Sequence, residues 1–248
     1  MHPRQHAFHA ALCAVVMGGA VLGAGGFQQP AAAPPQPAAP PPAPPRPPAT
    51  SLERPASPFR NPDAAGFIRR WLVLDPIRVS NQLTEGAIQV AVKKHAIEAP
   101  SLAPRDGQTV TVGDETLVWH AVDTLGYNVN LFHFAYARNK PTSNVLFWAV
   151  TVVHAPRDLP GVRLAIGSNA ASVWWLDGEE VIGLYNDRQA VIDDGVSKRV
   201  TLKKGAHIVR AAIVNAGGAT DFCARFIVED GNPVKGFTVN LAAESIER

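Results

Sequence analysis

The stretch VWWLDG at residues 173–178, followed by EEVIGLY at 179–185, contains two adjacent tryptophans and a turn signal. Asp-Gly is a favoured two-residue loop of a β-hairpin, because both of its central positions need positive φ. Successive residues of a strand point to opposite faces of a sheet, so one tryptophan can be buried while the other faces outward. Leu176 and the small Ser172 share a face with Trp174, which is therefore the predicted core residue.

The outward face of Trp175 has two interpretations. An exposed indole at this position would be a flat apolar platform on which the ring of a ligand can stack. The alternative is that another part of the fold covers the indole, either a helix predicted at residues 82–96 or the proline-rich segment that precedes the folded part. Parity alone leaves both interpretations open.

The flanking sequence repeats the pattern of short apolar runs separated by turn residues, at intervals of ~8–12 residues. Only residues 82–96 show convincing helical spacing, with basic residues near the end that suit the helix dipole. The pattern predicts an all-β antiparallel sandwich (a jelly roll) with one short helix. Strands are expected at 64–74, 109–113, 115–123, 127–135, 145–155, 162–168, 172–176, 179–185, 199–205, 206–215, 221–230 and 237–241, with the pair 199–205 and 206–215 joined as a hairpin through Lys204-Gly205.

The first 62 residues have a different character from the rest of the chain. Residues 1–26 contain Arg4, then a run of small and apolar residues, which is typical of an export signal. The alternative is an uncleaved signal anchor that tethers the protein to a membrane. Fourteen prolines between Pro30 and Pro62 favour an extended spacer over a packed core. We therefore predict a signal (1–26), a disordered Pro/Ala-rich linker (27–62) and a sandwich domain (63–248), in a periplasmic or extracellular protein.

Charge and cysteine content exclude several classes. The formal net charge is +2, and residues 59–248 carry equal numbers of basic and acidic residues. Nucleic-acid binders present a basic face, which this composition does not indicate. Removal of the predicted signal leaves one cysteine, Cys223, so no internal disulfide can form. The apolar neighbours of Cys223 favour a structural role over a catalytic one.

Several short motifs resemble a family of secreted bacterial proteins with a galactose-binding-like jelly roll. They are WLVLDP at 71–76, GS at 167–168, VWWLDG at 173–178 and VTLKKG at 200–205. The middle motif also resembles the ligand-side hairpin of PA14 modules. The resemblance covers roughly residues 64–240 and implies a non-catalytic β-sandwich, often associated with carbohydrate-active enzymes.

One departure from this family concerns calcium. Its calcium-dependent members place paired carboxylates where this chain has Asn169 and Ala170. Ca²⁺ prefers hard, negatively charged oxygen ligands, and alanine supplies none. We therefore do not carry calcium-dependent sugar binding over to this chain, and we expect no cofactor.

The densest polar segment is YNDRQAVIDDG, residues 185–195. Sandwich modules often present ligand contacts in loops between hairpins, and carboxylate pairs can accept hydrogen bonds from sugar hydroxyls or bind Ca²⁺. The alternative is a solvated loop whose aspartates make turns. The candidate ligand-binding residues are Trp175, Tyr185, Asn186, Asp187, Arg188, Asp193 and Asp194.

Catalytic and metal motifs are weak throughout. The sequence contains no nucleophile elbow and no phosphate-binding loop, so no catalytic residue is assigned. His133 and His154 fall on predicted strands that could be neighbours, but no carboxylate or cysteine is in register with them, so no metal site is assigned. The sequence favours a secreted binding module for carbohydrate or cell-envelope polymer. The alternatives are a structural or protein-interaction module of the envelope and, more weakly, an accessory domain of an esterase or other carbohydrate-active system.

Overall fold

The computed structural model describes residues 52–97 and 103–241. They form two antiparallel β-sheets with a shared core, which confirms the predicted all-β sandwich. The predicted export signal and residues 27–51 of the predicted linker lie outside the described residues. None of the helices in the described ranges is long and apolar enough to cross a membrane.

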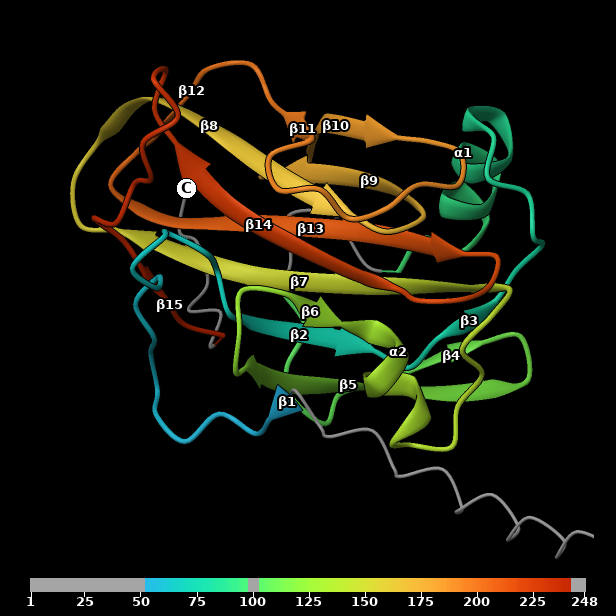
Figure 1. Ribbon diagram of the computed structural model, residues 1–248. Coiled ribbons are helices and arrows are strands. Elements are labelled where there is room, and N and C mark those ends of the chain that lie inside the picture. Colours follow the sequence, from blue (N-terminus) through green and yellow to red (C-terminus); the bar gives the residue numbers. More distant parts are fainter. Residues whose placement is uncertain (1–51, 98–102, 242–248) are drawn as a thin grey trace, which may run out of the picture. The chain divides into compact units, whose positions relative to one another are not determined.

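The larger sheet contains the opening hairpin and the longest strands (Figure 1). Its strands are β1 (Leu52–Glu53), β2 (Arg70–Leu74), β3 (Ile77–Arg78), β4 (Thr109–Val112), β5 (Glu115–Thr124), β7 (Val145–Ala155), β9 (Ala171–Leu176), β10 (Glu179–Leu184), β13 (Gly205–Asn215) and β15 (Thr238–Val239). The main order is β1-β5-β2-β7-β13-β9-β10. Off this order, β4 pairs with β5, and both β3 and β15 pair with β7.

The smaller sheet has the order β11-β8-β14-β6, and β12 also pairs with β8. Its strands are β6 (Val129–Asn130), β8 (Leu159–Ser168), β11 (Gly195–Val196), β12 (Val200–Leu202) and β14 (Asp221–Ile227). The predicted hairpin between residues 199–205 and 206–215 is therefore wrong. Both edges of β13 are occupied by β7 and β9, so Lys204-Gly205 leads the chain from one sheet to the other.

Strand β7 explains how the layers are held together. Its odd-numbered apolar residues, such as Phe147, pack between the two sheets, and its even-numbered ones, such as Trp148, pack on the opposite face of the larger sheet. A strand buried on both faces has a continuous apolar run, as VLFWAVTVV does. The larger sheet therefore has a core on each side.

Trp174 lies in the core between the sheets, as the alternation of side chains along the strand predicted. It is 0% exposed and packs edge-on against Trp71 at 6.1 Å and Phe222 at 5.4 Å between ring centroids. Its indole N–H donates a hydrogen bond to Ser172 Oγ at 3.0 Å. These three aromatic rings join β2, β9 and β14, and so join the two sheets.

The second core lies on the outer face of the larger sheet, beneath helix α1 (Glu85–Lys94). Ile88 and Val92 of this helix are buried, and Trp175 is half-buried in the same cluster. The ring of Trp175 lies 5.7 Å from that of Trp148. Gln89 of α1 donates to Glu180, which pairs with Trp175 across the hairpin. Of the two interpretations, the structure favours coverage by the predicted helix.

The Asp177-Gly178 turn has the predicted hairpin geometry, with φ values of 53° and 90°. The Asp177 side chain ties this turn to β13. Its Oδ1 accepts a hydrogen bond from the Ile208 amide at 2.8 Å, and its Oδ2 lies 2.6 Å from His207 Nδ1. The other ring nitrogen of His207 lies 2.8 Å from the Lys203 carbonyl oxygen. Both ring nitrogens thus face acceptors, which favours the protonated imidazolium.

This arrangement predicts a pH dependence of stability. The hydrogen bond with Asp177 raises the pKa of His207 above its ordinary 6.5, although burial opposes the shift. A raised pKa in the folded state means that the stabilisation is complete below about pH 6.5 and is lost as pH rises through the folded pKa. We expect the stability difference between the native chain and His207→Gln, measured as melting temperature, to shrink as the pH rises above 6.5. Asp177→Asn should show the same flattening, and a pH-independent difference would contradict this account.

The predicted strand at 127–135 is wrong in its second half. Only Val129–Asn130 is a strand, and Leu131–Tyr136 forms a short helix, α2, so the described residues contain two helices. The Asn130 side chain accepts a hydrogen bond from the His133 amide at 2.7 Å and thereby caps the helix. Leu131, Phe134 and Ala135 are buried at helical spacing. This spacing overrides the alternation that the sequence also contains.

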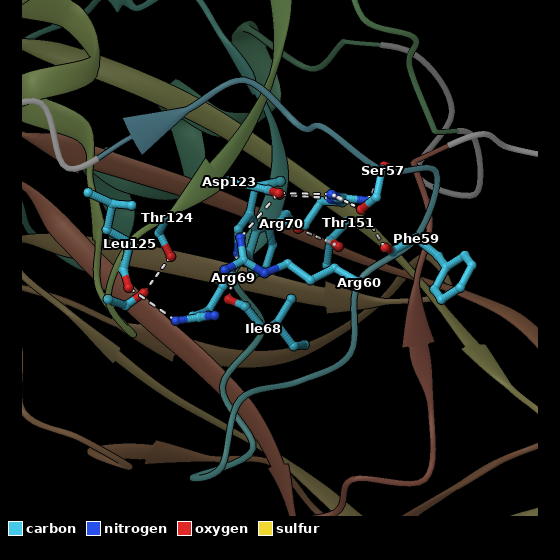
Figure 2. Close-up of polar contacts among 12 residues, drawn as sticks. Ser57, Phe59, Arg60, Ile68, Arg69, Arg70, Asp123, Thr124, Leu125 and Thr151 are labelled. Atoms are coloured by element: carbon cyan, nitrogen blue, oxygen red, sulfur yellow. Dashed lines mark hydrogen bonds and ion pairs between the residues drawn. The ribbon is translucent and has the colours of Figure 1, made fainter.

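Residues 52–62 belong to the sandwich, although the sequence assigned them to the linker. β1 pairs with the end of β5, and Figure 2 shows how ion pairs hold the segment that follows. Arg70 is 2% exposed and donates two hydrogen bonds of 2.8 Å to Asp123 and one of 2.8 Å to the Ser57 carbonyl. Arg60 adds an ion pair of 3.2 Å to Asp123. We call this set (Ser57, Arg60, Arg70 and Asp123) the arm clamp.

Candidate functional site

The predicted ligand loop, residues 185–195, packs against the smaller sheet. A Cβ atom on Gly167 of β8 would lie 2.2 Å from the Val191 carbonyl oxygen, so this close approach requires glycine. Cys223 lies beside the same contact and is buried. Burial raises the pKa of its thiol to about 11. The thiol is therefore protonated near neutral pH, which fits the predicted structural role.

The two carboxylates that the sequence suggested for ligand binding have cationic partners. Asp193 accepts hydrogen bonds from the guanidinium of Arg225 on β14, one of them at 2.9 Å from Nε. Asp194 forms an ion pair with Arg188 within the loop. These pairs fasten the loop to the sheet and to itself. They leave fewer free carboxylate oxygens for sugar hydroxyls or a cation.

The remaining loop candidates divide between helix α1 and solvent. Tyr185 Oη lies 3.2 Å from Gln89 Nε2, which donates to it. The Asn186 amide donates to the Leu83 carbonyl at 2.8 Å. Asp187 is exposed, and its carboxylate makes no hydrogen bond or ion pair within the described ranges. The loop therefore acts as a contact between α1 and the sandwich, with Asp187 facing water.

The loop at Asn169 and Ala170, where the calcium-dependent members of the resembled family have paired carboxylates, is held by backbone hydrogen bonds. The Asn169 amide donates to the Asp221 carbonyl at 2.8 Å, and Ala170 has a φ of 67°. Residues 52–97 and 103–241 contain no group of three or more His, Cys, Asp or Glu side chains arranged to hold a metal ion. The structure does not bring His133 and His154 together, because each lines a different pocket.

A pocket that the sequence did not indicate is lined by residues of β1, β5 and α2, elements that Figure 1 labels in the same part of the fold. Its volume is about 400 Å³, and its walls come from residues 52–54, 106–107, 120–122 and the helix positions His133, Phe134, Ala137 and Arg138. We call it the α2 pocket. Its volume lies in the ~300–1,000 Å³ range of ligand pockets, and half of its lining residues are polar: Glu53, Arg54, Asp106, His120, His133 and Arg138.

Helix α2 and the turn that follows it contribute Phe134 and Arg138 to the pocket walls. The Arg138 guanidinium lies 4.1 Å from the centroid of the Phe134 ring and donates to the Phe134 carbonyl at 3.0 Å. Burial lowers the pKa of Arg138, and Asp75 and Asp106 oppose that shift. Within the part of the chain that the structure describes, Arg138 forms no ion pair. It is therefore a partly desolvated cation that a ligand oxygen can reach.

Two histidines complete the polar lining. His120 Nε2 lies 3.1 Å from Asp75 Oδ1, and the His120 ring packs edge-on against Phe134. His133 Nδ1 is buried without a hydrogen-bond partner in the described residues. An unsatisfied buried polar atom is costly, and a water or ligand that reached this nitrogen would remove that cost.

A buried carboxylate behind the pocket orients these groups. Asp75 is 2% exposed and receives Lys140 Nζ at 3.1 Å as well as His120. Burial disfavours the charged form of Asp75, but hydrogen bonds from His120 and Lys140 outweigh it and hold the pKa below the ordinary value. Nearer the mouth, Asp106 accepts from the Ala121 amide at 2.8 Å and pairs with Arg54 at 3.2 Å. Both carboxylates are thus fixed in place.

Sequence reasoning missed this pocket for an identifiable reason. Its residues come from four segments, and the assignment of residues 127–135 to a strand placed His133 and Phe134 on opposite faces. The available signal was the sequence NLFHFAYAR (130–138), in which Asn130 can cap a helix and Phe134 precedes Arg138 by four positions. That spacing places the ring and the guanidinium on one helix face.

Comparisons with known proteins concern the fold. A scan against protein-family models and a search of curated proteins both found no match. Solved structures similar to this chain include the PA14 sugar-binding domain from an RTX adhesin, with 11% identity, a TM-score of 0.39, and coverage of 68% of this chain and 96% of that one. The PA14 domain of the antifreeze protein MpAFP has 11% identity, a TM-score of 0.40, and coverage of 75% and 96%. PA14 is the class of module that the sequence resemblance named.

A further similar structure is the β-glucosidase from Kluyveromyces marxianus in complex with glucose. It has 20% identity and a TM-score of 0.35, and the match covers 50% of this chain but 16% of the enzyme. This chain therefore spans a small part of that enzyme's length.

Proposed function

We propose that this protein is an exported, non-catalytic binding module for carbohydrate or cell-envelope polymer, and that the α2 pocket holds the ligand. The observation that carries the proposal is the convergence of hydrogen-bonding side chains from Arg138, His133 and Asp106 around one concavity. Sugars have apolar ring faces and many hydroxyls that both donate and accept. The donors and acceptors of the pocket match the hydroxyls, and its apolar lining residues Leu52, Ala121 and Ala137 match the ring faces.

The lining also favours binding over catalysis. The pocket is lined without a serine, threonine, cysteine or lysine, so covalent catalysis through a hydroxyl, a thiol or an amine has no nucleophile there. Asp106 is fixed by Arg54 and a backbone amide, and His120 by Asp75. Groups held in this way are suited to orienting a ligand by hydrogen bonds.

The test is retention of the full chain on a panel of insoluble polysaccharides. We expect Arg138→Ala to reduce the affinity for the retained polymer by about tenfold, since loss of a hydrogen bond from a charged group costs ~1.5–3 kcal/mol. Asp187→Ala, which changes an exposed loop residue, should bind as the native chain does. Melting temperatures of both variants control for folding.

The opposite result for the two variants would place the binding site elsewhere in the protein. Loss of retention in Asp187→Ala with full retention in Arg138→Ala would place binding in the 185–195 loop. No retention of the native chain on any polymer would contradict the proposal and favour a protein-interaction module of the envelope.

A further inference from the structure

A second pocket lies at the other end of β7, where β7 meets the start of β13 and the segment before β15. Its volume is about 420 Å³. The residues that matter for its chemistry are Asn61, His154, Pro156, Lys204, Lys235 and Phe237. We call it the β15 pocket. It shares no lining residue with the α2 pocket.

The charged residues that line this pocket are all basic. Lys204 and Lys235 line it and are exposed, and no Asp or Glu lines it. Neither lysine ammonium forms an ion pair within residues 52–97 and 103–241. The nearby carboxylate of Asp158 is occupied, because it receives Lys203 Nζ at 3.0 Å and the Lys204 amide at 2.8 Å. Both lysines therefore bring positive charge to the pocket, and neither ammonium is paired with an anion of the described residues.

His154 provides a further polar group beside the lysines. It lies on β7, opposite Ala206 of β13 and Thr238 of β15 in the sheet register. Its Nε2 is buried and has no hydrogen-bond partner in the described residues. A buried ring nitrogen without a partner carries an energetic cost, which a water or ligand that reached it would remove.

The rest of the lining is mostly apolar, with Ala155, Pro156 and the buried Phe237, and includes the uncharged polar residues Asn61 and Thr238. Lysine ammonium groups act as mobile point charges and are common binders of phosphate-like oxyanions. We propose that the β15 pocket is a second ligand site, which takes a phosphate or sulfate ester carried on a less polar body. This site does not depend on carbohydrate binding at the α2 pocket.

The probes are phenyl phosphate, phenyl sulfate, inorganic phosphate and uncharged phenol, titrated into the full chain by calorimetry at low salt. We expect saturable binding of at least one of the two esters, weaker binding of inorganic phosphate because it lacks the apolar body, and none of phenol. The two ester arms identify which oxyanion is preferred. Lys204→Ala with Lys235→Ala should weaken ester binding by about tenfold or more, because two charge-assisted hydrogen bonds are lost.

The matched control is Lys93→Ala, which removes an exposed lysine from α1 without touching the pocket. It should leave ester binding unchanged. Because Lys204 and Lys235 are exposed, the double variant should melt at the native temperature. Absence of ester binding by the native chain, equal binding by the double variant, or equal binding of phenol would overturn the proposal. None of these results bears on retention by polysaccharides, which reports on the α2 pocket.

Discussion

Replacing Asp123 by alanine is expected to lower the free energy of unfolding by about 3–5 kcal/mol, the usual cost of removing one partner from a buried ion pair. Asp123 receives two hydrogen bonds from Arg70 and an ion pair from Arg60. Arg70 is almost fully buried and would keep its charge without a counter-charge. The large effect therefore comes from the cation left behind, more than from the lost attraction.

The measurement is urea unfolding of the full chain, followed by tryptophan fluorescence. Arg199→Ala is the control, because it breaks an ion pair between exposed side chains, with Glu229, and exposed pairs contribute only ~0–1 kcal/mol. The double variant Arg70→Met with Asp123→Leu should recover much of the loss, since an apolar pair leaves no buried charge. If Asp123→Ala cost no more than Arg199→Ala, the arm clamp would not stabilise the fold.

Trp174→Ala is expected to cost about 3–5 kcal/mol, as truncation of a large buried aromatic side chain usually does. The indole fills the space between Trp71 and Phe222, so its removal leaves a cavity where the two sheets meet. It also leaves the Ser172 hydroxyl without its donor. Removing the neighbouring Trp175 should cost clearly less, because that ring is only half-buried and packs on the outer core.

Because Trp174 and Trp175 are adjacent, Trp175→Ala is a matched control for Trp174→Ala. Both variants remove the same atoms from the same strand, so strand propensity and the unfolded state change by nearly equal amounts. Thermal and urea unfolding should rank Trp174→Ala as the less stable variant. Equal losses, or a larger loss for Trp175→Ala, would mean that the outer core carries as much of the stability as the core between the sheets.

Much of the fold could be predicted because strand physics is local. Alternation assigned Trp174 inward and Trp175 outward, and Asp177-Gly178 marked a hairpin that the structure contains. The partner of a strand is not a local property. Residues 199–215 have the pattern of a hairpin, yet both edges of β13 are already paired, which only the complete sheet order reveals.

The candidate site was harder to predict because it depends on contacts far apart in the sequence. Asp193 looked like a free acidic ligand, but its partner Arg225 is 32 residues away. In the α2 pocket, Arg54 and Asp106 meet across 52 residues. Short-range motifs cannot distinguish a carboxylate that is free from one that is already neutralised. The helix cap at Asn130 was local, and it was missed because the same residues also alternate.

The arm clamp has a mechanical consequence. Leu52, Glu53 and Arg54 form one wall of the α2 pocket, and they are also the residues through which the chain passes from its proline-rich segment into the sheet. A pulling force that arrives from that side reaches this wall first and then the clamp at Arg70 and Asp123, before it reaches the long strands. Tension along the chain and the shape of the pocket are therefore linked by covalent connection.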